Sequence, residues 1–73
     1  MKYTIEVGSR FLLDGVVGGF TYLAVIEIKV ELDDGEAVAV ICYKDADSGD
    51  KIYERTADSM YAILVRRNAE QVN

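Results

Sequence analysis

The strongest constraint on the fold is an alternation of apolar and polar residues that begins at Phe20. A period of two places successive side chains on opposite faces of a β-strand. One face of the predicted strand holds Phe20, Tyr22, Ala24, Ile26, Ile28, Val30 and Leu32. The other face is apolar at Leu23 and Val25 but charged afterwards, at Glu27, Lys29, Glu31 and Asp33. We therefore predict a long strand that bends near its middle, where the part of the protein that packs against it changes.

The turn after this strand is predicted by the sequence Asp33-Asp34-Gly35. Asp-Gly pairs adopt the positive φ angles that a tight hairpin turn requires, so the next strand is expected to run antiparallel. That strand, over residues 36–43, is apolar on both faces. A strand of this kind is expected inside a sheet or beneath a partner.

The remaining segments predict further short elements. Residues 3–7 alternate as a first strand, and residues 10–13 form a second. The glycines of residues 15–19 indicate either a hairpin turn or a curled loop. Residues 51–55 form another strand, Thr56 caps one short 3₁₀ turn, and residues 61–65 form the last strand.

Together these elements predict a mainly β fold, a small antiparallel barrel of about five strands with one short 3₁₀ turn before the last strand. Residues 1–67 are expected to form a single small β domain. Residues 68–73 lose the apolar pattern and are expected to be a frayed C-terminal tail.

This order of elements resembles that of SH3-like barrels, and the likeness covers most of residues 10–65. Residues 38–43, 47–49 and 52–55 also resemble small phage or prophage proteins that share this architecture. The resemblance does not imply binding of proline-rich peptides, because the chain has no tryptophan for such a groove and lacks the acidic-tyrosine signature near the first strand.

Composition argues against catalysis and against a bound cofactor or metal. The chain has 73 residues, one cysteine and no histidine, so an intramolecular disulfide and a common zinc site are both excluded. Cys42 lies in an apolar run and is expected to be a buried core residue, not a nucleophile. The acidic loop around Asp45 fails the EF-hand spacing, since Asp50 and Thr56 stand where glycine and glutamate are needed.

Charge and cysteine usage suggest the kind of partner and the compartment. Thirteen acidic and eight basic residues leave a net charge of -5, which repels nucleic-acid phosphates and favours a basic partner. A lone cysteine, an alternating start and no apolar stretch long enough to span a bilayer predict a cytoplasmic protein with no membrane partner.

The leading functional hypothesis is a non-catalytic protein–protein interaction module, of the type of a phage inhibitor or adaptor, that binds a basic partner through acidic turns. It would act by steric blockade or by imitating nucleic-acid charge. Two tyrosines beside the second acidic turn would bind a cationic side chain by cation–π contact, together with the carboxylates of that turn. The candidate partner-binding residues are Glu31, Asp33, Asp34, Glu36, Tyr43, Asp45, Asp47, Asp50 and Tyr53. They form one surface only if both turns project to the same side.

Two alternatives belong to other classes. The apolar strand over residues 37–43 and the thin core also fit a structural or assembly subunit that acts as a homo-oligomer. A nucleic-acid-binding small barrel is the third reading, and it requires the basic residues to converge. Those residues are Lys44, Lys51, Arg55, Arg66 and Arg67.

Overall fold

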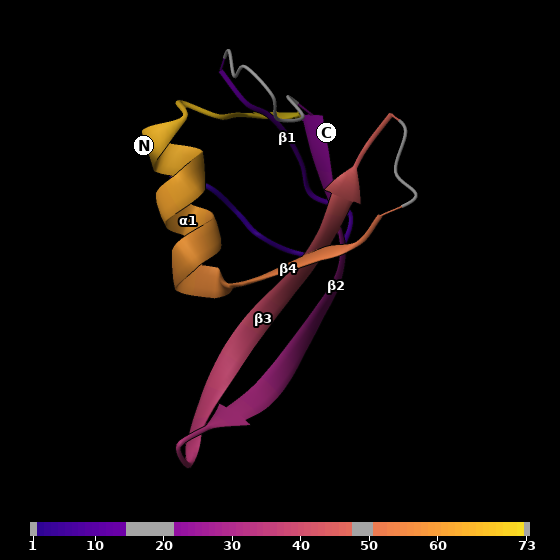
Figure 1. Ribbon diagram of the computed structural model, residues 1–73. Helices are drawn as coiled ribbons and strands as arrows, with labels where there is room; N and C mark the ends of the chain where they lie inside the picture. The colour runs from indigo at the N-terminus through magenta and orange to yellow at the C-terminus, as the bar shows by residue number, and fades with distance from the viewer. Residues whose placement is uncertain (1, 15–21, 48–50, 73) are drawn as a thin grey trace.

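The computed structural model describes residues 2–14, 22–47 and 51–72. Within them the chain forms five antiparallel strands and one helix, and the strands curl into a half-barrel in the order β4-β3-β2-β1-β5 (Figure 1). The mainly β prediction is confirmed. The elements are β1 (Arg10–Leu12), β2 (Tyr22–Asp33), β3 (Glu36–Asp45), β4 (Tyr53–Thr56), α1 (Ala57–Arg66) and β5 (Glu70–Val72).

The hairpin between β2 and β3 forms where the Asp-Gly pair predicts it. Asp33 lies opposite Glu36, and the two turn residues Asp34 and Gly35 have φ angles of 51° and 82°. Positive φ at both central positions is the type I′ geometry, which matches the twist of the flanking strands. The position of β3 between β2 and β4 confirms that it lies inside the sheet.

The predicted bend of β2 is a β-bulge between Val25 and Glu27. Before the bulge, Val25 pairs with Tyr43 on the core face. After it, Ile28 pairs with Ile41 on the same face. The extra residue therefore moves the inward positions from odd to even numbers, which explains why the odd positions are apolar at Leu23 and Val25 but charged from Glu27 onward.

Helix α1 covers the concave face of the sheet (Figure 1). Its residues Met60 and Leu64, four positions apart, point into the core and are almost fully buried. The core cluster consists of Tyr3, Phe11, Leu13, Leu23, Val25, Ile41, Tyr43, Met60, Leu64 and Ala69. No helix within the described residues has the length and hydrophobicity that crossing a bilayer requires.

The 3₁₀ turn and the last strand that the sequence predicts over residues 56–65 are replaced by this single α-helix. Thr56 is its N-cap, as predicted, and the Thr56 hydroxyl accepts a hydrogen bond from the N–H of Ser59 at 3.2 Å. The run Tyr61–Val65 is short and apolar, and such a run has no period that separates strand from helix. Burial of Leu64 against the sheet favours the helix.

Both ends of the chain differ from the sequence prediction. Residues 3–7 form no strand. The backbone of Thr4 nevertheless makes a pair of hydrogen bonds, as in a strand, but with a side chain. The Thr4 N–H donates to Oε1 of Gln71 at 2.9 Å, and the Thr4 carbonyl accepts from Gln71 Nε2 at 2.8 Å. The expected frayed tail instead carries β5, which pairs with β1. Asn68, with φ of 48°, ends the helix and turns the chain back to the sheet.

Candidate interaction surface

The distal half of the β2–β3 hairpin projects past the N-terminal end of α1 (Figure 1). The β4 ladder stops where Thr56 pairs with Val40, and the β1 ladder stops where Arg10 pairs with Ala24. Val25 also makes backbone hydrogen bonds with Gly8 and Ser9, and beyond Val25 and Val40 the two strands pair only with each other in the described part of the chain. We call residues 28–39 the arm. Two-stranded ribbons are marginally stable alone in water, so the arm depends on its base.

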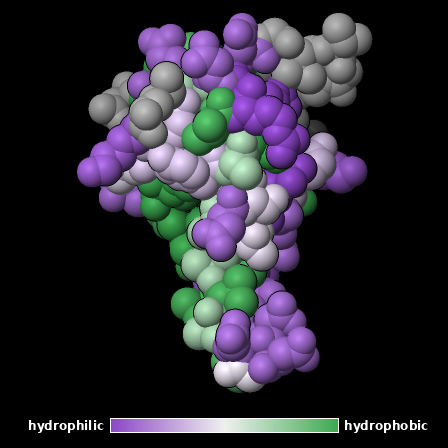
Figure 2. All heavy atoms as spheres, turned by 90° about the vertical axis from the view of Figure 1, so that its left-hand side faces the viewer, coloured by the Kyte–Doolittle hydropathy of each residue, from purple (hydrophilic) through white to green (hydrophobic). Residues whose placement is uncertain are grey.

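One face of the arm is apolar and exposed. Cross-strand pairing puts Val30 opposite Ala39 and Leu32 opposite Ala37, on the side of the sheet that α1 covers nearer the base. Val30 is 70% exposed and Leu32 is 79% exposed. Figure 2 shows hydrophobic surface continuing down the arm to a hydrophilic tip. We call Ile28, Val30, Leu32, Ala37 and Ala39 the apolar arm face.

The opposite face of the hairpin carries an ion-pair network over a buried thiol. Lys29 Nζ lies 2.9 Å from Glu54 Oε2 and 3.4 Å from Glu31 Oε2. Its hydrogen bond and attraction to Glu54, with a smaller contribution from Glu31, raise the pKa of Lys29. Cys42 is 2% exposed, as predicted, and burial together with the nearby Glu54 carboxylate raises the pKa of its thiol. A thiol in this environment is a poor nucleophile.

Four of the predicted partner-binding residues gather at the tip of the arm, and all are exposed. They are Glu31, Asp33, Asp34 and Glu36, and we call them the acidic tip. Lys29 is the only basic residue in residues 22–43, and it is engaged by Glu31 and Glu54. The tip therefore presents a negative surface at the end of an apolar strip.

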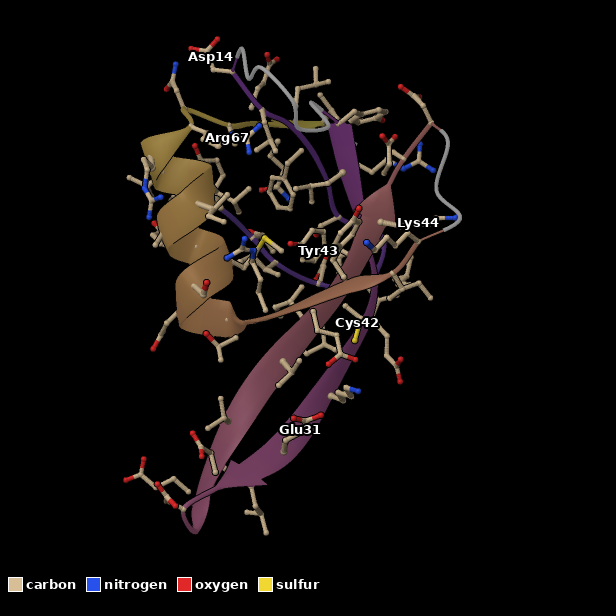
Figure 3. The ribbon with its side chains drawn as sticks, in the orientation of Figure 1. Asp14, Glu31, Cys42, Tyr43, Lys44 and Arg67 are labelled. Carbon is tan, nitrogen blue, oxygen red and sulfur yellow. The ribbon has the colours of Figure 1, made fainter. Side chains whose placement is uncertain are left out.

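The second acidic turn lies at the other end of the same hairpin. Asp45 ends β3, and its carboxylate accepts a hydrogen bond from the N–H of Asp47 at 2.8 Å. Asp45 is roughly 30 Å from Glu36 along the strand, at about 3.3 Å per residue. In Figure 3, Glu31 on the arm and Lys44 near the base are likewise well apart. The structure thus separates the two acidic turns, and Asp50 lies outside the described residues.

Tyr43 and Tyr53, the two candidate tyrosines, lie side by side, but the cations beside them are Arg55 and Lys51 of the same chain and not those of a partner. The rings of Tyr43 and Tyr53 stack with centroids 5.7 Å apart. Tyr43 is buried, and its hydroxyl accepts a hydrogen bond from Arg55 Nε at 2.9 Å. Lys51 Nζ lies 5.2 Å from the centre of the Tyr53 ring. These contacts make the pair part of the base of the hairpin.

The basic residues named for nucleic-acid binding do not all converge, although Lys51 and Arg55 both lie beside the stacked pair of Tyr43 and Tyr53. Arg55 is held by Tyr43 and by Ser59, whose hydroxyl oxygen is 3.1 Å from Arg55 Nη1. Lys44 and Arg67 lie on opposite sides of the sheet (Figure 3). No group of three or more potential metal ligands occurs in residues 2–14, 22–47 and 51–72. The glycine-rich segment of residues 15–19, and Phe20, lie outside the described residues.

Sequence reasoning missed one feature, a hollow between the arm and the start of α1. It has a volume of about 320 Å³ and is lined by residues 36–39 and 56–58. Glu36 and Asp58 place carboxylates at its border, and the other residues that line it are uncharged. The hollow exists because β4 leaves the sheet at Thr56, which no local sequence pattern indicates.

No family model, curated protein or solved structure matches the chain significantly.

Proposed function

We propose that the protein is a non-catalytic protein–protein interaction module and that the projecting arm is its contact element. The observation that carries the proposal is the exposure of Val30 and Leu32 on a ribbon that ends in four carboxylates. Exposed apolar surface rimmed by charge is typical of protein-binding sites. The partner is a protein with a basic surface, since the tip offers negative charge and Lys29 is already engaged.

The same proposal includes the SH3-like assignment and the phage or prophage setting. The first rests on the order of short strands, a long bent strand, a tight hairpin, a helical segment and a returning last strand. The second rests on sequence resemblance alone. Action as an inhibitor or adaptor would follow from an arm that reaches a partner while the rest of the fold blocks access to it.

A matched pair of double variants tests the arm. The arm variant, Val30→Ser with Leu32→Ser, removes apolar surface from the arm. The control variant, Val7→Ser with Val65→Ser, removes apolar surface elsewhere. All four residues are exposed, so neither variant disturbs the core. Each immobilised protein is used to capture partners from a candidate host lysate. We expect proteins retained by the wild type and by the control to be lost from the arm variant.

Salt tests the charged part of the proposal. Raising ionic strength from about 0.1 M to about 1 M shortens the screening length from about 10 Å to about 3 Å, so retention should fall steeply. Equal retention by the arm variant would show that the arm is not the contact element, and retention that salt does not weaken would show that the acidic tip does not contribute to binding.

A homo-oligomeric assembly subunit is the second candidate, and it is favoured by the same apolar arm face. Two copies packed by these faces would bury Val30 and Leu32 in an isologous contact. Light scattering at micromolar concentration tests it. An oligomer that the arm variant converts to a monomer supports this function, and a wild-type monomer eliminates it.

A further inference from the structure

Among the described residues, no strand pairs with the β3 side of the arm, which leaves an open backbone edge there. Residues 36–39 pair with β2, whereas the β4 ladder reaches only to Val40. Asp33 and Glu36 close a two-residue turn, so they exchange both hydrogen bonds with each other. Alternation then directs the N–H groups of Ala37 and Ala39 away from β2, toward the open edge. Such an edge is a template on which another strand can pair.

The surroundings of this edge leave space for the side chains of an added strand. The hollow of about 320 Å³ lies along the edge, between residues 36–39 and the first turn of α1. Ala37 and Ala39 share this side of the arm with Leu32 and Val30, their cross-strand neighbours. An aliphatic side chain of an added strand would enter the hollow and extend the apolar arm face sideways.

Charge selects the occupant. Glu36 and Asp58 border the hollow, and none of the described residues that line it is basic. The rest of the acidic tip lies at the same end of the arm. A second copy of this chain would bring the same carboxylates to the contact, where like charges oppose association. A strand with lysine or arginine beside its aliphatic residues would place opposite charge there.

We propose that the edge formed by residues 36–39 accepts a β-strand from another protein, an extended segment in which basic and aliphatic residues alternate. This inference rests on the proposed function and adds the mode of binding and the class of partner. Main-chain hydrogen bonds would provide the pairing, the hollow would take an aliphatic side chain, and the carboxylates would select basic residues.

The probe is a short end-blocked peptide in which lysine alternates with valine, titrated into the ¹⁵N-labelled full chain. We expect chemical-shift changes at residues 36–39 and 56–58, and slower exchange of the Ala37 and Ala39 amide protons, by about tenfold at saturation. A peptide with glutamate in place of lysine should bind at least about tenfold more weakly.

Backbone methylation tests strand pairing without altering the protein. One peptide carries N-methyl groups on its lysines and the other carries them on its valines. In an extended peptide the two sets of N–H groups point to opposite edges, so each methylated peptide lacks the donors of a different edge. One of the two should lose binding and the other should keep it. Equal binding of both methylated peptides, or no spectral change with the parent peptide, overturns strand addition.

Two chain variants separate this inference from the proposed function. Ala37 and Leu32 lie opposite each other, and proline at either position removes one outward N–H from one edge of the arm. Ala37→Pro should weaken peptide binding about tenfold, whereas Leu32→Pro should leave it unchanged. If host proteins captured through Val30 and Leu32 are retained equally by Ala37→Pro, the arm is confirmed as the contact element and strand addition is wrong.

Discussion

The hydroxyl of Tyr3 donates a hydrogen bond of 2.6 Å to the carbonyl oxygen of Ala69. Both residues are buried, and they lie 66 positions apart in the sequence. The Tyr3 ring also makes edge contacts with Phe11 and Tyr61, at centroid distances of 5.9 Å and 5.8 Å. This contact holds the N-terminal segment against the segment that links α1 to β5.

Tyr3→Phe is expected to lower the free energy of unfolding by about 1 kcal/mol, because the ring stays and one buried carbonyl loses its donor. Urea denaturation measures this change, and amide exchange in β5 should become faster. Ile52→Ala, at an exposed position, serves as the control and should stay within about 0.5 kcal/mol. A Tyr3→Phe variant as stable as the wild type would show that the hydrogen bond contributes nothing.

Thr56→Ala should destabilise the protein by about 1 kcal/mol, since the N–H of Ser59 loses its acceptor at the start of α1. Thr56→Ser keeps the hydroxyl and is the matched control. Thermal unfolding followed by circular dichroism compares the three proteins. The prediction fails if the serine variant is as unstable as the alanine variant.

Gly35→Ala should cost about 1 kcal/mol through the backbone alone. The φ angle of Gly35 is 82°, and a Cβ placed there meets no heavy atom within 4 Å. Because Asn tolerates positive φ, Gly35→Asn should cost less. Amide exchange of residues 28–39 should report the change, since a two-stranded ribbon is expected to open locally. A loss as large as the roughly 2–5 kcal/mol of a Leu64→Ala core truncation would contradict this explanation.

The buried thiol of Cys42 predicts how stability depends on pH. In the unfolded chain the thiol ionises near its ordinary pKa of 9.0, whereas in the folded protein its pKa is higher. As pH rises from about 8 to about 10, the unfolded state loses this proton first, so the free energy of unfolding should fall. Urea denaturation of Cys42→Ala across this range should show a flatter decline than the wild type.

Lys29 affects the same pH profile in a different window. Its pKa is raised above the ordinary value of 10.5 by Glu54, so its contribution is complete below that pH and is lost only as pH rises further. A Cys42→Ala profile as steep as that of the wild type between about pH 8 and about pH 10 would therefore exclude the thiol as the cause.

The candidate site was predictable in its parts but not in its assembly. Residues 31–36 were identified because turn chemistry places charge at a hairpin tip, and the tip has that charge. The grouping of Asp45 with Asp33 was not decidable from sequence, since a hairpin places its two ends a full ladder apart. The open edge at Ala37 was invisible as well, because it depends on where β4 stops.

Local chemistry alone determined the hairpin at Asp34-Gly35 and the N-cap at Thr56, since each depends on backbone preferences or on hydrogen bonds within a few residues. The bend near Val25 was predictable from the change of apolar face along the strand. Tertiary structure decided the rest. Residues 61–65 are helical because this conformation buries Leu64 against the curled sheet. Residues 70–72 are a strand because they pair with the edge of β1 that β2 does not use. Whether a short apolar segment is more stable as a helix or as a strand depends on the surface against which it packs. That surface is assembled from residues far away in the chain.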